Sequence, residues 1–176
     1  DTSLLEPILV SLMNSHVVEY DRKGIVRERQ GNRVTNYSVP RNAYRTADDQ
    51  WVALSASSSS IAHRILRIVG GDELAEDPRF RTHSGRAEHA DELDERIGEW
   101  MARHDREEVI EIFEEHDAAI APIYDVEDVF EDPHLRERDA LITVEDDELG
   151  ELTMNGVFPK LSETPGRVEH PGPKLG

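Results

Sequence analysis

Apolar residues recur at helical spacing in four segments of the chain. In residues 4–19 they lie on one face of the predicted helix, at Leu4, Leu5, Ile8, Leu9, Leu12 and Met13. The same spacing predicts helices over residues 60–69, 90–104 and 106–116. We expect their inward side chains to form the core, centred on Trp100, Leu93, Ile97, Phe113 and Ile65.

Residues near the ends of these helices carry start and stop signals. The pair Gly70-Gly71 is expected to end the helix that begins near residue 60. The serines at 57–60 precede that helix, where serine usually caps the first turn. Asp105 is expected to cap the helix over 106–116, and Asp125 a short helix over 126–130.

Short strands are predicted between and after the helices. Residues 50–55 form a strand, and residues 118–123 form a small apolar strand or bend. Residues 141–144 and 151–154 are joined by a polar turn and predict a hairpin. Residues 21–40 read as one long polar connection. Helices and short strands that mix along one chain indicate an α/β or α+β fold.

Charge is the strongest feature of the composition. Among 176 residues there are 38 acidic and 20 basic side chains, so the net charge is −18. Such a surface repels nucleic acid and anionic lipid. Lysine occurs only at Lys23, Lys160 and Lys174, and an acidic, lysine-poor composition favours a protein adapted to high salt. An ordinary acidic bacterial protein is the alternative interpretation. No apolar run reaches the roughly 18 residues that a membrane span needs, and there is no cysteine.

No catalytic centre can be assembled from the residue types alone. The eight histidines form no HExxH pair: His16, His63, His83, His89, His104, His116, His134 and His170. His83, Glu88 and His89 have weak metal-ligand spacing, for which a solvated surface is the favoured interpretation. The acidic residues 145–148 lie in the predicted hairpin turn, which offers little apolar cover to raise a carboxyl pKa. We therefore predict no metal site.

Four segments resemble, in order and spacing, the C-terminal half of family III CoA-transferases, the family of formyl-CoA transferase and carnitine CoA-transferase. The segments are RNAYRTADDQWVAL, GGDELAEDPRFRTHSGRAEHADELDERI, AAIAPIYDVEDVFEDPHLRERDAL and FPKLSETPGRVEHPGPKLG. The resemblance implies the C-terminal part of that fold, in a homodimer whose two subunits interlock. It implies a linking helix and a loop near the active site in residues 1–42, a small domain in 43–121, and a return segment with a β-hairpin in 122–176.

The resemblance also implies a mechanism. An aspartate of the family attacks an acyl-CoA thioester and carries the acyl group and then CoA as covalent intermediates. That aspartate lies upstream of the region that resembles residues 4–19, so no residue here takes its role. We expect the N-terminal remainder of the protein to supply it, the 176 residues alone to be inactive, and the protein to be cytoplasmic. Coenzyme A thioester is the substrate, and no cofactor is expected.

One element near the active site is expected within the chain. The family places a mobile loop just before the small-domain strand, and the matching stretch here is GNRVTNYSVP, with a single glycine. Its candidate substrate-proximal residues are Gly31, Asn32, Asn36, Tyr37 and Pro40. A plain connection between domains is the alternative interpretation of this stretch.

Two other functions stay open. The related α-methylacyl-CoA racemases carry a glutamate just after the small-domain strand, and here its place falls at Ser58, which has no carboxylate. The chain could also be an acidic interaction module without catalysis. For the transferase we expect succinyl-CoA as donor and a small dicarboxylate such as mesaconate or citramalate as acceptor, an expectation that rests on the salt-adapted composition and on no residue.

Overall fold

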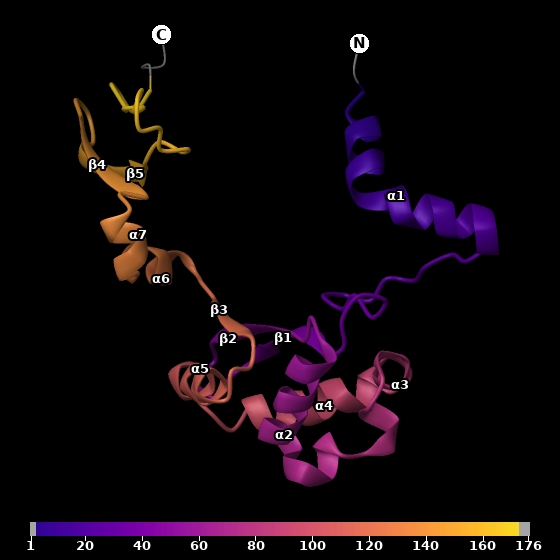
Figure 1. Cartoon of the computed structure of the whole chain (residues 1–176). Coiled ribbons are helices and arrows are strands. Elements are labelled where there is room, and N and C mark those ends of the chain that lie inside the picture. Colours follow the sequence, from indigo (N-terminus) through magenta and orange to yellow (C-terminus); the bar gives the residue numbers. More distant parts are fainter. Residues whose placement is uncertain (1–2, 173–176) are drawn as a thin grey trace.

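The computed structural model describes residues 3–172, and it has a central body from which two arms extend (Figure 1). One arm is α1, and the other contains α6, α7, β4 and β5. The elements are α1 (Leu5–Lys23), β1 (Arg41–Arg45), β2 (Trp51–Ser55), α2 (Ser59–Ala75), the short 3-10 helix η1 (Pro78–Phe80), α3 (His83–Glu88), α4 (Ala90–Met101), α5 (Arg106–Glu115), β3 (Ile120–Ile123), α6 (Val126–Glu131), α7 (Pro133–Glu137), β4 (Leu141–Asp146) and β5 (Gly150–Asn155).

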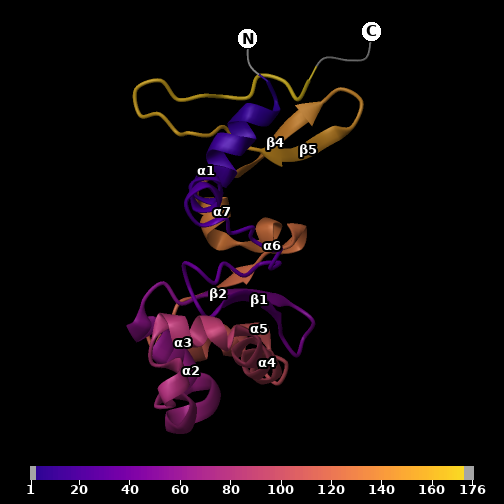
Figure 2. The same ribbon diagram turned by 90° about the vertical axis from the view of Figure 1, so that its right-hand side faces the viewer.

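The central body is a two-layer α+β unit. Its sheet has the antiparallel order β1-β2-β3, and helices α2 to α5 lie on one side of it (Figure 2). Because side chains alternate along a strand, Val52 and Leu54 of β2 are buried toward the helices. Trp51 and Ala53 point the opposite way and are exposed, so the second face of the sheet is open toward the arms.

The core consists of two clusters: one lies between the sheet and helices α2, α4 and α5, and the other, which holds Leu93, lies among α2, η1 and α4. The five side chains expected at its centre are all at most 8% exposed: Trp100, Leu93, Ile97, Phe113 and Ile65. Trp100 stacks on His104 and lies 5.8 Å from the ring of Phe113. Among the described residues, every buried side chain lies between Ser38 and Ala118, which confines the core to the central body.

Several predicted helix and strand signals are confirmed. Asp125 caps α6 in a capping box, in which its Oδ1 accepts hydrogen bonds from the backbone amides of Glu127 at 2.8 Å and Asp128 at 3.0 Å. Ser58 caps α2 by accepting from the amide of Ile61 at 3.2 Å. The predicted hairpin is formed by β4 and β5, and the small apolar segment before it is strand β3.

One further expectation is confirmed with an addition, and another was wrong. The first helical part of α2 is interrupted at Gly70-Gly71 as predicted, because both glycines have non-helical φ and ψ and Gly71 adopts a left-handed φ of 65°; the chain then resumes a helix that buries Leu74. Asp105 makes no capping hydrogen bond. The first amide of α5, that of Arg106, instead donates to the Asp48 carboxylate at 3.2 Å.

The long connection predicted over residues 21–40 is partly helix and is followed by a strand that was missed. Helix α1 continues to Lys23, beyond the residue 19 at which we expected it to end. Strand β1 exists because it pairs along its whole length with β2, from Arg41 with Ser55 to Arg45 with Trp51. Only Tyr44 of its five side chains is fully buried, so its apolar signal in the sequence was weak.

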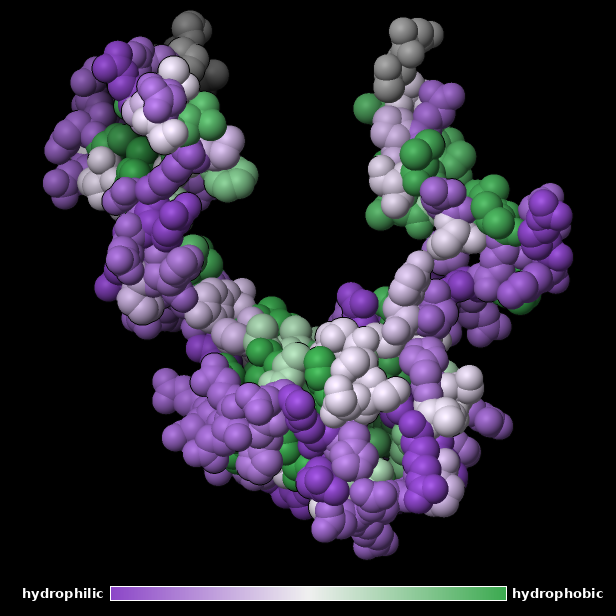
Figure 3. Space-filling view, viewed as in Figure 1, coloured by the Kyte–Doolittle hydropathy of each residue, from purple (hydrophilic) through white to green (hydrophobic). Residues whose placement is uncertain are grey.

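The two arms have little apolar cover of their own. Helix α1 has no buried residue, and hydrophobic side chains gather along it (Figure 3). Leu5 is 72% exposed and Leu12 is 69% exposed. In the other arm Phe158 is 90% exposed, and both α6 and α7 have no buried residue. None of the helices within residues 3–172 is both long and apolar enough to cross a bilayer.

Candidate functional site

A shallow hollow of about 510 Å³ lies on the open face of the three-stranded sheet. It faces the space between the arms, where neutral and hydrophobic residues gather on the upper side of the central body (Figure 3). Its lining comes from all three strands and from the loop before β1: Asn32, Arg41, Asn42, Ala43, Ala53, Leu54, Ser55, Ala119, Ile120, Ala121 and Ile123.

The floor of this sheet hollow is made by a row of three alanines. Ala43 pairs with Ala53, and Ala53 pairs with Ala121, so the three methyl groups lie side by side across the sheet. The next row toward one end carries the larger side chains of Trp51 and Ile123, which also pair directly. Small residues between larger ones leave the depth into which another molecule or chain segment can fit.

The polar groups of the sheet hollow lie at its other end. Arg41 pairs with Ser55 across the strands, and Asn32 reaches the hollow from the preceding loop. The guanidinium of Arg41 is exposed and makes no ion pair or hydrogen bond with any side chain in residues 3–172. A free guanidinium beside an apolar floor can bind a carboxylate or a phosphate in bidentate fashion. No carboxylate is among the lining residues described.

A hydrogen-bonded network on α4 holds the start of the loop. Asp94 is 11% exposed on its side chain, and it accepts hydrogen bonds from Arg33, from the hydroxyl of Tyr44, and from Asn42 Nδ2 at 3.1 Å. Burial, followed by the hydrogen bond to Asp94, raises the pKa of the Tyr44 hydroxyl. The hydrogen bond to Asp91 raises the pKa of the Arg33 guanidinium. The network thus ties the loop to both β1 and α4.

The end of the loop is held by the residue that follows β2 and by α3. Ser38 Oγ donates to the carbonyl of Ala56 at 2.7 Å, and the amide of Ala56 donates to the carbonyl of Pro40 at 2.9 Å. The buried Arg86 donates from Nε to the carbonyl of Val39 at 2.7 Å. Val39-Pro40 is a cis peptide bond. The loop is therefore fastened at both ends, and its middle lies at the surface.

The five candidate loop residues do not all line the same hollow. Asn32 lines the sheet hollow, whereas Pro40 is buried and Gly31 forms an exposed turn with φ of 64°. Asn36 and Tyr37 line a different hollow of about 490 Å³ together with residues of α1. Whether any of the five contacts a substrate remains a prediction.

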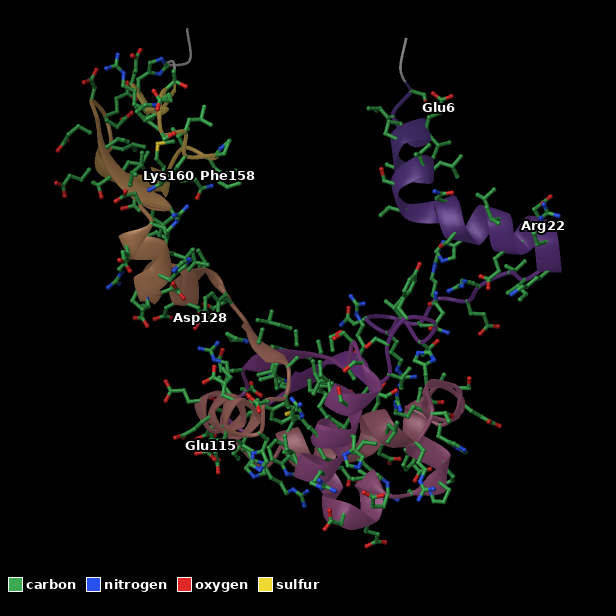
Figure 4. The ribbon with its side chains drawn as sticks, in the orientation of Figure 1. Glu6, Arg22, Glu115, Asp128, Phe158 and Lys160 are labelled. Atoms are coloured by element: carbon green, nitrogen blue, oxygen red, sulfur yellow. The ribbon has the colours of Figure 1, made fainter. Side chains whose placement is uncertain are left out.

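The second hollow carries positive charge from the end of α1. Arg22 and Lys23 lie in its last turn, and Arg27 follows it. Figure 4 shows Arg22 at the C-terminal end of α1, from which the chain continues toward the central body, and Glu6 at the N-terminal end. Arg27 pairs with Glu19 through its Nε at 2.5 Å. This hydrogen bond lowers the pKa of the Glu19 carboxyl.

The weak metal-ligand spacing does not become a site. Within residues 3–172 no group of three or more His, Asp or Glu side chains is placed to hold a metal ion. His83 opens α3, and its Nε2 is buried without a hydrogen-bond partner. His89 instead packs edge-on against the ring of Phe80, with ring centroids 6.0 Å apart.

Sequence reasoning missed Arg41 and Ser55 as candidate site residues. They become neighbours only because β1 pairs with β2, and β1 was not predicted. The alternation in residues 41–45, in which Arg41, Ala43 and Arg45 share one face, was the signal that could have found them.

Comparison with known proteins gives a consistent result. A family model, CoA-transferase family III, matches residues 1–176. Succinyl-CoA--D-citramalate CoA-transferase of Chloroflexus aurantiacus is 39% identical over the whole chain, which spans 43% of that protein. The beta subunit of succinyl-CoA--L-malate CoA-transferase from the same organism is 36% identical over 86% of the chain and 38% of its own length.

A solved structure supports the fold. The crystal structure of a CAIB/BAIF family protein from Brucella suis matches 93% of this chain and 42% of its own length, with a TM-score of 0.74 and 22% sequence identity. The chain thus spans about two fifths of the length of the proteins it matches.

Proposed function

The chain belongs to CoA-transferase family III, and from this premise we propose that the complete protein transfers coenzyme A between an acyl-CoA and a small carboxylic acid. The match of the family model over all 176 residues is the observation that carries the proposal. The activity is assigned to the complete protein because the chain spans less than half of its curated relatives.

We propose succinyl-CoA as the donor and a small dicarboxylate as the acceptor. The two relatives described above are named for transfer from succinyl-CoA to citramalate and to malate, both of which are dicarboxylates. Arg41 supports this choice, because an unpaired guanidinium at an apolar hollow can bind the carboxylate that does not react. The alanine row beneath it leaves space for a short carbon chain.

The proposed chemistry uses an aspartate outside residues 1–176. Its carboxylate attacks the thioester carbonyl and expels CoA thiolate, which leaves a mixed anhydride. The thiolate then attacks the aspartyl carbonyl and releases the donor acid. The acceptor carboxylate attacks the resulting aspartyl thioester, and the returning thiolate completes the new acyl-CoA and frees the aspartate. The sheet hollow would shape the acyl side of this site, and no cofactor is required.

Arg41 provides the direct test. In the complete protein, Arg41→Gln should raise the KM for the dicarboxylate about tenfold or more and change kcat much less, since a charged hydrogen-bonded pair is worth about 1.5–3 kcal/mol. Arg45→Gln is the matched control: it lies on the same strand and face but outside the hollow, where it pairs with Asp49 at 2.5 Å. CoA transfer would be followed by chromatography of the acyl-CoA products.

Two outcomes of this experiment test two different claims, the role of Arg41 in the substrate site and the transferase activity itself. Equal KM values for the two variants would remove Arg41 from the substrate site while leaving the transferase assignment intact. Absence of CoA transfer from succinyl-CoA by the wild-type complete protein, to any of citramalate, mesaconate and malate, would contradict the proposed function itself.

A racemase is the alternative enzyme. The position of the racemase glutamate falls at Ser58, whose hydroxyl is engaged as the cap of α2. A serine hydroxyl at a helix cap offers no carboxylate for acid–base work. Loss of an α-deuterium from a 2-methylacyl-CoA without any exchange of CoA would support the racemase and reject the transferase.

We also propose that α1 packs against polypeptide outside residues 1–176, from the N-terminal remainder or from the second subunit of an interlocked homodimer. Its unburied apolar side chains support this. On this view the 176 residues alone turn over no substrate, and the complete protein works in the cytoplasm without nucleic acid partners. Turnover by the isolated chain would contradict the proposal and would favour an autonomous site; a 176-residue monomer in the cell would favour the interaction module.

A further inference from the structure

Arg86 is a buried cation that has only neutral hydrogen-bond partners. Its residue is 2% exposed. Nε donates to the carbonyl of Val39 at 2.7 Å, and Nη1 donates to the carbonyls of Phe80 at 2.9 Å and Arg81 at 3.3 Å. Its remaining nitrogen, Nη2, makes no hydrogen bond within residues 3–172 and is not fully enclosed by them.

The charge of Arg86 is also uncompensated. No carboxylate of the described residues forms an ion pair with it, although many other arginines of this acidic chain do so, such as Arg79 with Asp77 and Arg106 with Asp128. Burial lowers the pKa of the Arg86 guanidinium. A buried charge is costly unless an opposite charge compensates it. The groups around Nη2 therefore determine how much free energy the burial of this charge costs.

A hollow of about 260 Å³ adjoins Arg86. It lies between α2 and the segment that runs from η1 to α3, and the bend at Gly70-Gly71 returns the end of α2 to its side. Its lining shares no residue with the sheet hollow and consists of Ser59, His63, Leu66, Ala75, Glu76, Phe80, Arg81 and Arg86.

The donors of this Arg86 hollow suit a small anion. Arg81 is exposed, and its guanidinium makes no ion pair or hydrogen bond with the described side chains. Ser59 opens the 17-residue helix α2, whose N-terminus carries partial positive charge. Glu76 is the acid of the lining. Its Oε1 is already engaged by His63 Nε2 at 3.1 Å and by Arg67 Nη2 at 3.4 Å.

We propose that the Arg86 hollow binds a small oxyanion of the phosphate or sulfate type. Arg86 Nη2, the guanidinium of Arg81 and the Ser59 hydroxyl are its donors. Planar guanidinium groups match the geometry of such oxygens. The bound anion neutralises Arg86, which also holds the Val39 carbonyl at the end of the loop, and so stabilises the central body. This proposal does not depend on the transferase assignment.

Calorimetric titration of the purified protein with sodium phosphate, and separately with sodium sulfate, tests the proposal. Sodium chloride at matched ionic strength is the reference. Wild-type protein should show saturable binding of phosphate or sulfate. Arg81→Gln should weaken the affinity about tenfold or more, because one charged donor is lost. Arg103→Gln is the matched control: it removes the same charge from an exposed arginine outside the hollow and should leave the affinity unchanged.

A second variant addresses Arg86 itself. Arg86→Lys keeps the charge but loses the planar set of donors, and it should also weaken oxyanion binding about tenfold, with circular dichroism to establish that it is folded. If Arg86→Lys does not fold, the pair of Arg81 and Arg103 variants decides. Heats equal to those of chloride, or equal affinities for Arg81→Gln and Arg103→Gln, would overturn the proposal.

Discussion

Trp100 and Trp51 are the two tryptophans of the chain, and they lie on opposite faces of the sheet. Trp100 of α4 is 8% exposed, stacks on His104 with ring centroids 4.0 Å apart, and belongs to the core. Trp51 of β2 is 45% exposed on the open face. The two tryptophans thus differ in burial: Trp100 is part of the core, whereas Trp51 lies at the surface.

This difference predicts unequal costs of truncation. Trp100→Ala should lower the free energy of unfolding by about 3–5 kcal/mol, because it removes a buried aromatic side chain and leaves a cavity. Trp51→Ala, the control, should change it by only about 0.5 kcal/mol, as is usual at exposed positions. Urea denaturation of the isolated chain measures both values. Similar costs for the two variants would mean that Trp100 is not in the core.

Asp128 gives a pH-dependent prediction. Hydrogen bonds from Arg106, at 2.8 Å and 2.5 Å, lower its folded pKa from 3.8 to about 2. Because the folded pKa is the lower one, its stabilising contribution is complete above about pH 4 and is lost as the pH falls toward 2. Asp128→Asn should therefore destabilise the protein at neutral pH, and the difference from wild type should shrink in acid.

Denaturation at a series of pH values checks this. A difference between wild type and Asp128→Asn that is constant from neutral pH to about pH 2 would contradict the pairing. Asp128 lies where the C-terminal arm leaves the central body (Figure 4), and its pair with Arg106 links that arm to α5.

At the scale of elements, Asp94 of α4 is the main anchor of the loop before β1. Its removal leaves the buried hydroxyl of Tyr44 without an acceptor, which costs about 1–3 kcal/mol. Asp94→Ala should destabilise the protein by that amount and speed amide exchange at Tyr37 and Ser38, whose amides donate to the carbonyl of Val34 at 2.8 Å and 3.1 Å.

Asp91→Ala is the matched control for this prediction. Asp91 also lies on α4 and also pairs with Arg33, but its side chain is 92% exposed, and an exposed pair is worth little. Hydrogen exchange should therefore be nearly unchanged in this variant. Faster exchange to the same degree in both variants would show that Arg33 alone holds the loop.

The elements differ in how well the sequence predicts them. The core face of α4 and the hairpin of β4 and β5 follow from local periodicity, and both predictions are confirmed. Strand β1 has one fully buried side chain and depends on pairing with β2, so its local pattern was too weak. The interruption of α2 at Gly70-Gly71 also follows from the local sequence, whereas the helix that resumes after Gly71 was not predicted, because it depends on the burial of Leu74.

At the scale of the whole molecule, charge dominates. The net charge of −18 should destabilise the folded chain in dilute buffer by self-repulsion. At about 1 M salt the Debye length is only about 3 Å, so this repulsion is screened. We expect the Tm of the isolated chain to rise steadily with KCl up to molar concentrations, as measured by differential scanning calorimetry. A flat response would contradict adaptation to high salt.

The sequence by itself determined the helical faces, the core residues, the hairpin and the charge, because each depends on residues that are close along the chain or on composition alone. The resemblance of four segments also indicated the family, which the family model confirms. The tertiary structure alone decided that the loop is fastened at both ends and that three of its candidate residues, Asn32, Asn36 and Tyr37, are divided between two hollows. It also decided that Arg41 and the alanine row line the sheet hollow and that Arg86 lines a separate hollow. These depend on contacts between segments far apart in sequence, and such contacts form only when strands pair and helices pack, so no local pattern records them.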